Sequence, residues 1–250
     1  MKLLSGKTAL ITGSSRGIGA ATAQMLADHG AAVVVNYMNS KQAADQIVKD
    51  IEVKGGKAYA IQADVSDPIQ IKELIAKSNE KLGQIDILVL NASFNFPIVP
   101  FLQYKWEDFE TKLTNEMKSA FHCCKEVVPD MIARKSGHII AVSSGLSRQP
   151  GFGFCAHSSA KSALDAFAKS LALELGPESI RVNVIAPGLT DTDATSNLPE
   201  DIKQMIASQT PLKRYAVPED IAGAILMLAA DQSKFITGAY IPVSGGIQII

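Results

Sequence analysis

The chain has 250 residues, of which 47% are hydrophobic and 20% are charged. This length and composition are enough for one substantial buried core, so we expect a single domain over residues 1–250. The formal net charge is -1, and no cluster of lysine or arginine offsets it. These features argue against nucleic acid and against an anionic membrane surface as partners, and they favour small-molecule chemistry.

No stretch of the sequence predicts export or insertion into a membrane. The longest apolar run, residues 221–230, is far shorter than the roughly 20 residues that cross a bilayer, and we interpret it as a buried helix. The N-terminus leads into a predicted strand without a signal-peptide pattern. The three cysteines, Cys123, Cys124 and Cys155, cannot all form disulfides, so we expect a reducing cytoplasm.

Apolar, β-branched runs alternate along the chain with longer amphipathic stretches. We expect strands near residues 8–11, 32–35, 58–62, 85–90, 138–142, 181–185 and 239–243, with helices between them. Strands that are apolar throughout indicate a sheet covered on both faces, and repeated strand-helix-strand units indicate parallel strands. The sequence therefore predicts an α/β protein with a doubly wound parallel sheet of about seven strands.

Two segments lack a clear period, and each follows a predicted strand. Residues 93–103 are rich in phenylalanine and proline, and residues 190–209 are rich in small polar residues. Because ligands bind at the carboxyl ends of parallel strands, the first segment would supply apolar walls and the second a mobile lid. The alternative for each is an ordinary surface loop.

The most informative motif runs from Thr12 to Gly19 and contains Gly13, Ser15, Arg16, Gly17 and Ile18. It lies between the first predicted strand and a helix that extends from Ile18 to His29. A strand that turns sharply into a helix presents free N–H groups and the positive end of the helix dipole to a pyrophosphate, and glycines let the backbone approach closely. The motif predicts a dinucleotide site on a single-domain Rossmann fold.

The motif resembles the Thr-Gly-x-x-x-Gly-x-Gly loop of the short-chain dehydrogenase/reductase family, and the resemblance extends over the whole chain. It is closest to the bacterial 3-oxoacyl-acyl-carrier-protein reductases. It implies cofactor contacts from the glycine loop and from later residues: Asn36, Tyr37, Asp64, Val65, Asn91, Ala92, Lys161, Pro187, Gly188 and Thr192. In this family the aspartate contacts the adenine, and the segment around Thr192 holds the nicotinamide carboxamide.

The end of the second strand bears on which nicotinamide cofactor the chain binds. Enzymes that prefer NAD commonly place an acid there to bind the ribose 2′-OH, whereas this strand ends in Asn36, Tyr37 and Met38. Arg16, Ser40 and Lys41 would hold a 2′-phosphate, as basic groups do in NADP-preferring relatives. We therefore expect NADP(H) as cofactor and no metal ion. The alternative is that Arg16 only caps or solvates its loop.

The resemblance implies hydride transfer to a carbonyl, with Asn115, Ser144 and Lys161 at the catalytic positions. At the position of the family's catalytic tyrosine, four residues before Lys161, the chain has His157. A neighbouring ammonium lowers the pKa of a phenol toward neutrality, but it disfavours the charged form of an imidazole. We expect His157 to be mainly neutral at pH 7, and carbonyl reduction to be slow or confined to a substrate that lies deeper in the site.

Three functions remain open at this point. The first is an NADP(H)-dependent oxidoreductase that acts on a 3-oxoacyl thioester or another ketone, as in fatty acid or polyketide metabolism, with His157 and Ser144 doing the acid-base work. The second is a weakly active or inactive cofactor-binding subunit that pairs with an active relative. The third is a non-redox enzyme in which His157 removes a proton next to a carbonyl. The resemblance also implies a homo-tetramer or dimer.

Overall fold

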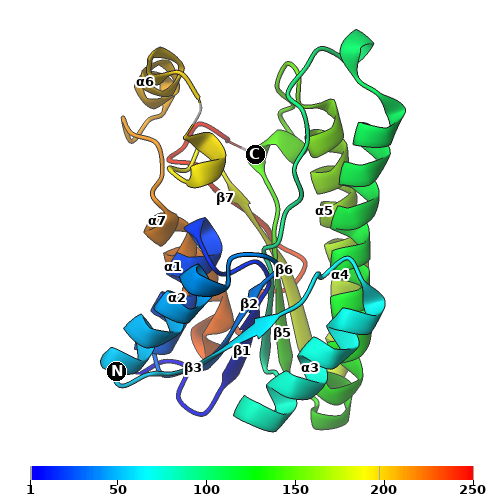
Figure 1. Cartoon of the computed structure of the whole chain (residues 1–250), viewed down its shortest axis with the longest axis vertical. Helices are drawn as coiled ribbons and strands as arrows, with labels where there is room; N and C mark the ends of the chain where they lie inside the picture. Colours follow the sequence, from blue (N-terminus) through cyan, green and yellow to red (C-terminus); the bar gives the residue numbers. More distant parts are fainter. Residues whose placement is uncertain (1, 197, 250) are drawn as a thin grey trace.

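The computed structural model describes residues 2–196 and 198–249. Its centre is one seven-stranded sheet, all parallel, with the strand order β3-β2-β1-β4-β5-β6-β7 (Figure 1). The strands are β1 (Thr8–Ile11), β2 (Ala32–Tyr37), β3 (Lys57–Gln62), β4 (Ile87–Leu90), β5 (Gly137–Val142), β6 (Ile180–Pro187) and β7 (Tyr240–Val243). All seven predicted strands are confirmed, and so is the doubly wound α/β class.

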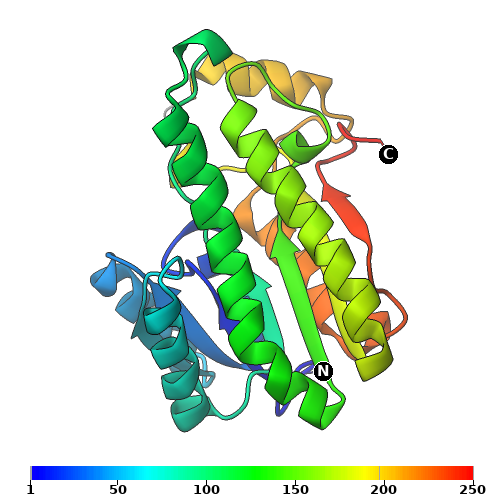
Figure 2. The ribbon, with the colours of Figure 1, turned by 90° about the vertical axis from the view of Figure 1, so that its right-hand side faces the viewer.

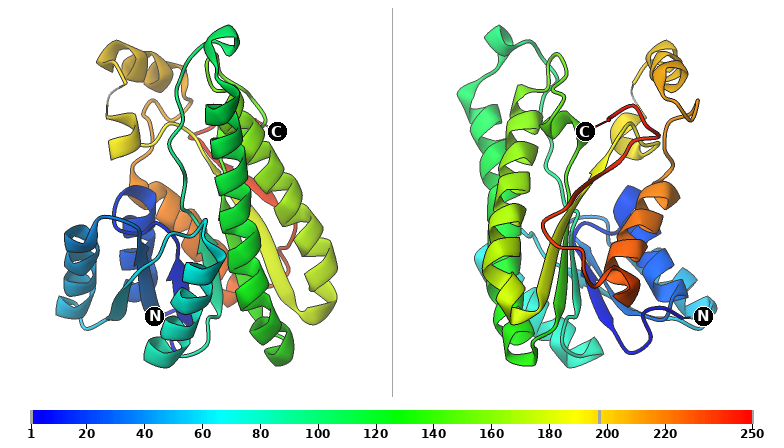
Figure 3. Two further views of the ribbon diagram at one scale, coloured as in Figure 1. Left: turned by 45° about the vertical axis from the view of Figure 1, so that its right-hand side comes forward. Right: turned by 180° about the vertical axis from the view of Figure 1, so that it is seen from behind.

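Helices cover both faces of the sheet. They are α1 (Gly17–Asp28), α2 (Lys41–Val53), α3 (Pro68–Leu82), α4 (Trp106–Arg134), α5 (Cys155–Leu175), α6 (Glu200–Gln209) and α7 (Pro218–Ala229). Figure 2 shows α4 and α5 side by side over one face, and Figure 3 shows α1 and α7 on the other. Each face closes a separate apolar core, one including Leu88, Val127 and Leu164 and the other including Leu26, Ile140 and Ile225.

Local sequence signals explain where several helices begin and end. The Asp67 carboxylate accepts hydrogen bonds from the amides of Ile69 and Gln70, and Pro68 occupies the first turn, so α3 begins there. After α1 the chain reverses at Gly30, where φ is +98°, a value that favours glycine. The predicted buried helix at 221–230 is the body of α7.

The order of the strands defines where a ligand site belongs. From β1 the chain builds outward through β2 and β3, and then returns to add β4 on the other side of β1. In doubly wound sheets the crevice lies at this reversal, outside the carboxyl ends of the strands. In Figure 1 the segments that follow β4 and β5 rise above this edge on one side, and the segment that follows β6 rises on the other.

The segment after β6 is more regular than the sequence indicated. We predicted an irregular stretch over 190–209, but its described residues form a short 3-10 turn, η4 (Asp193–Thr195), and the whole of α6. Acidic residues in the first turn of α6, Glu200 and Asp201, stabilise its N-terminus, a signal that the abundance of small polar residues concealed. Within the described part of the chain, no helix is long and apolar enough to span a membrane.

Candidate active site

The glycine loop joins β1 to α1 at the carboxyl edge of the sheet. Gly13 and Gly17 have φ values of +62° and +55°, which let the chain turn directly from the strand into the helix. The residue that precedes α1, Arg16, makes no side-chain capping hydrogen bond, so no side-chain cap covers the amides of the first turn. Free amides at a helix N-terminus are able to bind an anion such as a pyrophosphate.

Side chains from β4 hold the loop against the sheet. Asn91 donates from Nδ2 to the carbonyl oxygens of Thr12 and Gly13, at 2.9 and 3.1 Å. A Cβ at Gly19 would lie 2.6 Å from both Asn91 Nδ2 and the Gly13 carbonyl, so only glycine fits there. The amides of Asn91 and Ala92 donate to the Thr12 hydroxyl. Thus Asn91 supports the loop, and its amide group is already engaged.

Asn36 and Tyr37 were predicted to contact the cofactor, and the structure places both side chains elsewhere. The Asn36 side chain is buried, accepts from the Gly13 amide at 2.9 Å and donates to the Ala63 carbonyl at 3.1 Å. Tyr37 is 6% exposed and belongs to the core beneath α1 and α2. The end of β2 turns these residues inward because a two-sided sheet buries both faces of its strands. Asn36 supports the glycine loop, and Tyr37 packs in the core.

Two residues that the sequence assigned to the adenine end follow β3. Asp64 is partly exposed, and one of its carboxylate oxygens accepts from the amide and the hydroxyl of Ser66, both at 2.8 Å. Val65 is buried against the core. The fixed Asp64 carboxylate is therefore preorganised at the carboxyl edge, where the family's adenine contact would lie.

The segment after β6 lies over the glycine loop from the opposite side. A Cβ at Gly17 would lie 3.4 Å from Thr192 Cγ2, and Arg16 Nη1 lies 4.0 Å from a carboxylate oxygen of Asp193. Pro187 ends β6, and a Cβ at Gly188 would lie 3.1 Å from the Ser244 Cα. The structure thus brings Thr192 close to the glycine turn, while its contact with the nicotinamide carboxamide stays a prediction.

The other half of the edge carries Ser144, directly after β5. Its hydroxyl oxygen accepts from the Leu146 amide at 3.2 Å, and among the described residues its proton has no acceptor. The neighbouring Gly145 leaves room for the side chain of Gln248 from the C-terminal segment, which a Cβ at this position would overlap. Ser144 is therefore able to donate a hydrogen bond to a ligand at the carboxyl edge of the sheet.

Lys161 lies on α5 and is 3% exposed. Its ammonium donates to the Val142 carbonyl at 2.8 Å and forms an ion pair with Glu116 Oε1 at 2.5 Å. The other carboxylate oxygen of Glu116 pairs with the ammonium of Lys112 at 2.7 Å. Both partners project from α4, and all three side chains are almost completely buried. We call Lys112, Glu116 and Lys161 the charge cluster.

The resemblance implied a catalytic role for Asn115, and the structure places this residue outside the charge cluster. Asn115 is only partly buried and makes no side-chain hydrogen bond with any described residue. Consecutive residues of a helix point about 100° apart, so Glu116, one position later, is the residue that faces Lys161. Glu116 and Lys112 were missed. Both fall on the stripe of α4 that continues as Ser119, Ala120 and Cys123, a periodicity that would have revealed them.

His157 lies one helical turn before Lys161 on α5. Its ring is stacked on Phe96, with the ring centroids 4.7 Å apart and an angle of 19° between the planes, and Phe154 flanks it edge-on. Nδ1 is buried and has no hydrogen-bond partner among the described residues. The segment rich in phenylalanine therefore does supply an apolar wall, and that wall holds the imidazole.

Burial and the neighbouring charges determine the protonation state of the His157 imidazole. Burial, then Lys161 and Lys112, lower the pKa of His157 to about 3, while Glu116 acts weakly in the opposite direction. Burial would raise the pKa of Glu116, but the two ammonium groups lower it to about 2. Burial also lowers the pKa of Lys112 to about 8. At pH 7 the imidazole is neutral, as the sequence predicted, whereas Glu116 and Lys112 are charged.

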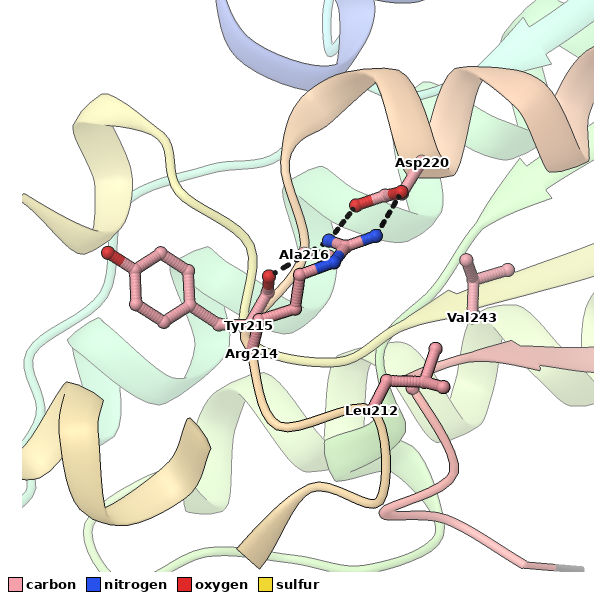
Figure 4. Close-up of a pocket in the computed structure, with 7 residues that line it drawn as sticks. Leu212, Arg214, Tyr215, Ala216, Asp220 and Val243 are labelled. Carbon is pink, nitrogen blue, oxygen red and sulfur yellow. Dashed lines mark hydrogen bonds and ion pairs between the residues drawn. The ribbon is translucent and has the colours of Figure 1, made fainter. Parts of the chain in front are cut away.

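A separate small cavity lies near the start of α7 and is lined by Leu212, Arg214, Tyr215, Ala216, Asp220, Val243 and Gly245 (Figure 4). Its charged groups are already paired, because the Arg214 guanidinium binds both oxygens of Asp220 at 2.6 and 2.8 Å. This pair fixes the turn that leads into α7 and leaves no free charge in the cavity. The chemistry therefore belongs to the main edge of the sheet.

The strand order, the glycine turn at the reversal point and the buried lysine on α5 define a doubly wound α/β protein of the dinucleotide-binding class. A family model described as enoyl-(acyl carrier protein) reductase matches residues 13–248. The chain belongs to the short-chain dehydrogenase/reductase family and is an oxidoreductase of that type.

Several relatives are similar over nearly the whole chain. The 3-oxoacyl-[acyl-carrier-protein] reductase FabG of Staphylococcus epidermidis is 36% identical, with 97% of this chain and 99% of the relative covered. The corresponding reductase of Synechocystis sp. is 40% identical, with 99% of each covered.

Two solved structures resemble this one closely. A blue fluorescent protein from a metagenomic library, in complex with NADPH, has a TM-score of 0.90 and 34% identity, with 99% of this chain and 100% of that chain covered. A 7α-hydroxysteroid dehydrogenase, complexed with NADH and 7-oxo glycochenodeoxycholic acid, has a TM-score of 0.92 and 35% identity, with 97% and 94% covered.

Proposed function

We propose that the protein is an NADP(H)-dependent carbonyl oxidoreductase that acts on a 3-oxoacyl thioester or another ketone. The observation that carries this proposal is the meeting of two half-sites at one edge of the sheet. The glycine turn follows β1, and Ser144 follows β5. Lys161 on α5 reaches the same edge, where it donates to the carbonyl of Val142 at the end of β5. The relatives that reduce 3-oxoacyl groups and the structural neighbours that bind NADPH or NADH support the same reaction.

The preference for NADP(H) rests on charge at the end of β2. This strand is followed by Met38, Asn39 and Ser40, with no acid that would repel a 2′-phosphate. Arg16 is free to turn toward the phosphate, because its 4.0 Å contact with Asp193 is exposed to solvent and weak. A guanidinium binds phosphate with two parallel hydrogen bonds, which gives it an advantage over lysine.

The side chains of the second half-site divide the work. Lys161 donates one N–H group to Val142 and is held by its ion pair with Glu116, which leaves an N–H group for a ribose hydroxyl. Ser144 and neutral His157 donate hydrogen bonds to the carbonyl oxygen, and neutral imidazole is known to polarise a carbonyl in this way. When bound, the reduced nicotinamide supplies the hydride. With a pKa of about 3, His157 is a poor source of the proton, so we expect slow turnover.

The test is consumption of NADPH over a panel of ketones and acyl thioesters by the unaltered protein and by His157→Phe. We expect His157→Phe to lower kcat by roughly tenfold to a hundredfold while the NADPH dissociation constant stays within about threefold. Unchanged turnover in His157→Phe would contradict the role of His157. A gain of roughly a hundredfold or more in His157→Tyr would favour a weakly active subunit instead.

That second candidate, a cofactor-binding subunit of an assembly with an active relative, is favoured by the low pKa of His157. We also propose that the chain forms dimers or tetramers through α4 and α5, where Phe121 and Leu173 are exposed apolar side chains. Co-purification with a second short-chain reductase from the native host supports the hetero-oligomer. A homogeneous tetramer with full turnover excludes it.

A further inference from the structure

Lys112 is a completely buried ammonium whose three protons all have acceptors in the protein. It donates to Glu116 Oε2 at 2.7 Å, to Ser93 Oγ at 2.8 Å and to the Phe94 carbonyl at 2.9 Å. Two of these acceptors belong to the segment that follows β4. Lys112 therefore ties α4 to residues 93–94 and has no proton left for a ligand.

The same ammonium also contacts the wall that holds the imidazole. Lys112 Nζ lies 5.1 Å from the centroid of the Phe96 ring, and this ring stacks on His157. The Phe96 ring therefore contacts both the ammonium of Lys112 and the imidazole of His157. Loss of the ammonium would release the 93–96 segment and, with it, the surface against which His157 packs.

The opposite side of the cluster reaches Lys161. Glu116 accepts from Lys112 through one oxygen and pairs with Lys161 through the other, so one carboxylate spans two ammonium groups. The cluster carries one net positive charge, from two ammonium groups and one carboxylate. The charged groups that face His157 are Lys112 and Glu116 from α4 and Lys161 from its own helix, while Phe96 and Phe154 contribute only apolar surface.

Stability alone does not account for such a cluster. A buried ion pair often contributes no more than apolar side chains of similar volume would, because desolvation offsets the attraction. An apolar residue at position 112 would continue the buried stripe of α4 without this cost. The pair is placed where Glu116 contacts Lys161 and where Lys112 contacts Phe96, the ring that stacks on His157.

We propose that Lys112 and Glu116 are positioning residues: their ion pair anchors the 93–96 wall over His157 and, through the carboxylate, fixes the ammonium of Lys161. This inference rests on the proposed function, but its structural part is measurable without turnover. Neither residue touches the reacting atoms. Each acts through a neighbour, Lys112 through Phe96 and Glu116 through Lys161.

The first test is hydrogen-deuterium exchange in Lys112→Met, with Lys118→Met, an exposed lysine of the same helix, as matched control. We expect exchange in the peptide that covers 93–97 to rise roughly tenfold or more in Lys112→Met. The glycine-loop peptide should keep its rate in both variants, and the NADPH dissociation constant should stay within about threefold. Unchanged exchange at 93–97, or an equal rise in the Lys118→Met control, overturns the proposal.

A second variant covers the case in which Lys112→Met fails to fold because Glu116 loses a partner. The double variant Lys112→Met/Glu116→Met leaves no carboxylate at position 116 without its Lys112 partner, and its 93–97 peptide should exchange as fast as expected for the single variant. If this peptide exchanges at the unaltered rate, the anchoring role is wrong.

Kinetics then separate positioning from simple support of the fold. In Lys112→Met we expect KM for the ketone to rise at least roughly fivefold, with a smaller change in kcat, because the wall is displaced while Ser144 and Lys161 remain. In Glu116→Gln, which removes the charge that fixes Lys161, kcat should fall more than KM rises. Equal effects of both variants on the two constants overturn the proposal. If no ketone is reduced, while NADPH binds normally and the exchange rates at 93–97 change as expected, only the proposed function is contradicted.

Discussion

The two halves of the site are built in different ways. The nucleotide half, around Gly13 to Gly19, consists of backbone held by neutral hydrogen bonds from Thr12, Asn36 and Asn91. The carbonyl half, around Lys161, is held by buried charges from α4. The first arrangement depends on the absence of side chains, and the second depends on the balance of charge among three of them.

This difference predicts how each half responds to change. A glycine turn fails by steric overlap, whereas a charge cluster fails when one partner is lost and the other stays buried without compensation. The fold is shared with the solved structures, and the two halves of the proposed site should respond differently to substitution. Substitutions in each half, compared with controls nearby, test that distinction.

The largest expected effect is on stability, from Glu116→Leu. Removal of the carboxylate leaves the ammonium groups of Lys112 and Lys161 buried and facing each other, which should lower the free energy of unfolding by about 3 to 5 kcal/mol. Urea denaturation measures this change in the free energy of unfolding. The control is Glu110→Leu, an exposed position on the same helix, where we expect a change below about 0.5 kcal/mol. A loss below about 1 kcal/mol for Glu116→Leu would mean that the cluster is not held as described.

The nucleotide half should break at Gly19. In Gly19→Ala the new Cβ would overlap Asn91 and the Gly13 carbonyl, so we expect NADPH to bind roughly a hundredfold more weakly, about 3 kcal/mol. Gly223→Ala on α7 is the matched control, because a Cβ there meets nothing within 4 Å. Fluorescence titration with NADPH measures both variants. Unaltered affinity in Gly19→Ala would contradict the assigned phosphate turn.

A smaller effect distinguishes the two nicotinamide cofactors. Arg16→Ala should weaken NADPH about tenfold and NADH about twofold or less, because only the former carries the 2′-phosphate. The same change at the exposed Lys49 on α2 serves as control and should leave the ratio unchanged. Equal weakening of both cofactors by Arg16→Ala would mean that this side chain supports the loop and not cofactor choice.

The smallest effect comes from the imidazole. Its pKa is about 3 in the folded protein and near 6.5 when unfolded, so the unfolded chain binds more protons in between and stability falls as pH drops below 6.5. His157→Phe removes this dependence and should gain about 1 kcal/mol relative to the unaltered protein between pH 7 and pH 5.5. His138, whose pKa is also lowered, is present in both proteins and cancels. A constant difference across this range would show that His157 is not held neutral.

Most of the fold follows from local patterns. Each strand is a short apolar run that the sheet buries on both sides, and glycine or Asp67 marks the neighbouring turns. The glycine loop was predictable for the same reason, since its function depends on backbone between consecutive elements. Its contacts to Asn36 and Asn91 were not, because β2 and β4 meet the loop only after the sheet has formed.

The carbonyl half was predicted only in part. The resemblance gave Ser144, His157, Lys161 and Asn115 as candidate catalytic residues, but it did not reveal Glu116, the residue of α4 that pairs with Lys161. Consecutive residues of a helix point about 100° apart. A motif match that ignores the buried stripe of α4 therefore cannot tell which of two neighbouring residues faces the site. Lys112 was not singled out, because its acceptors in residues 93–94 meet α4 only in the folded chain.

Calorimetric titration of the unaltered protein with NADPH and with NADH tests the central claim most directly. The proposed nucleotide half, with Arg16 and no acid after β2, predicts heat of binding and a dissociation constant on the order of micromolar for NADPH, with NADH at least about tenfold weaker. Absence of heat with both nucleotides, from protein that is folded by its melting curve, would contradict the assignment of the site.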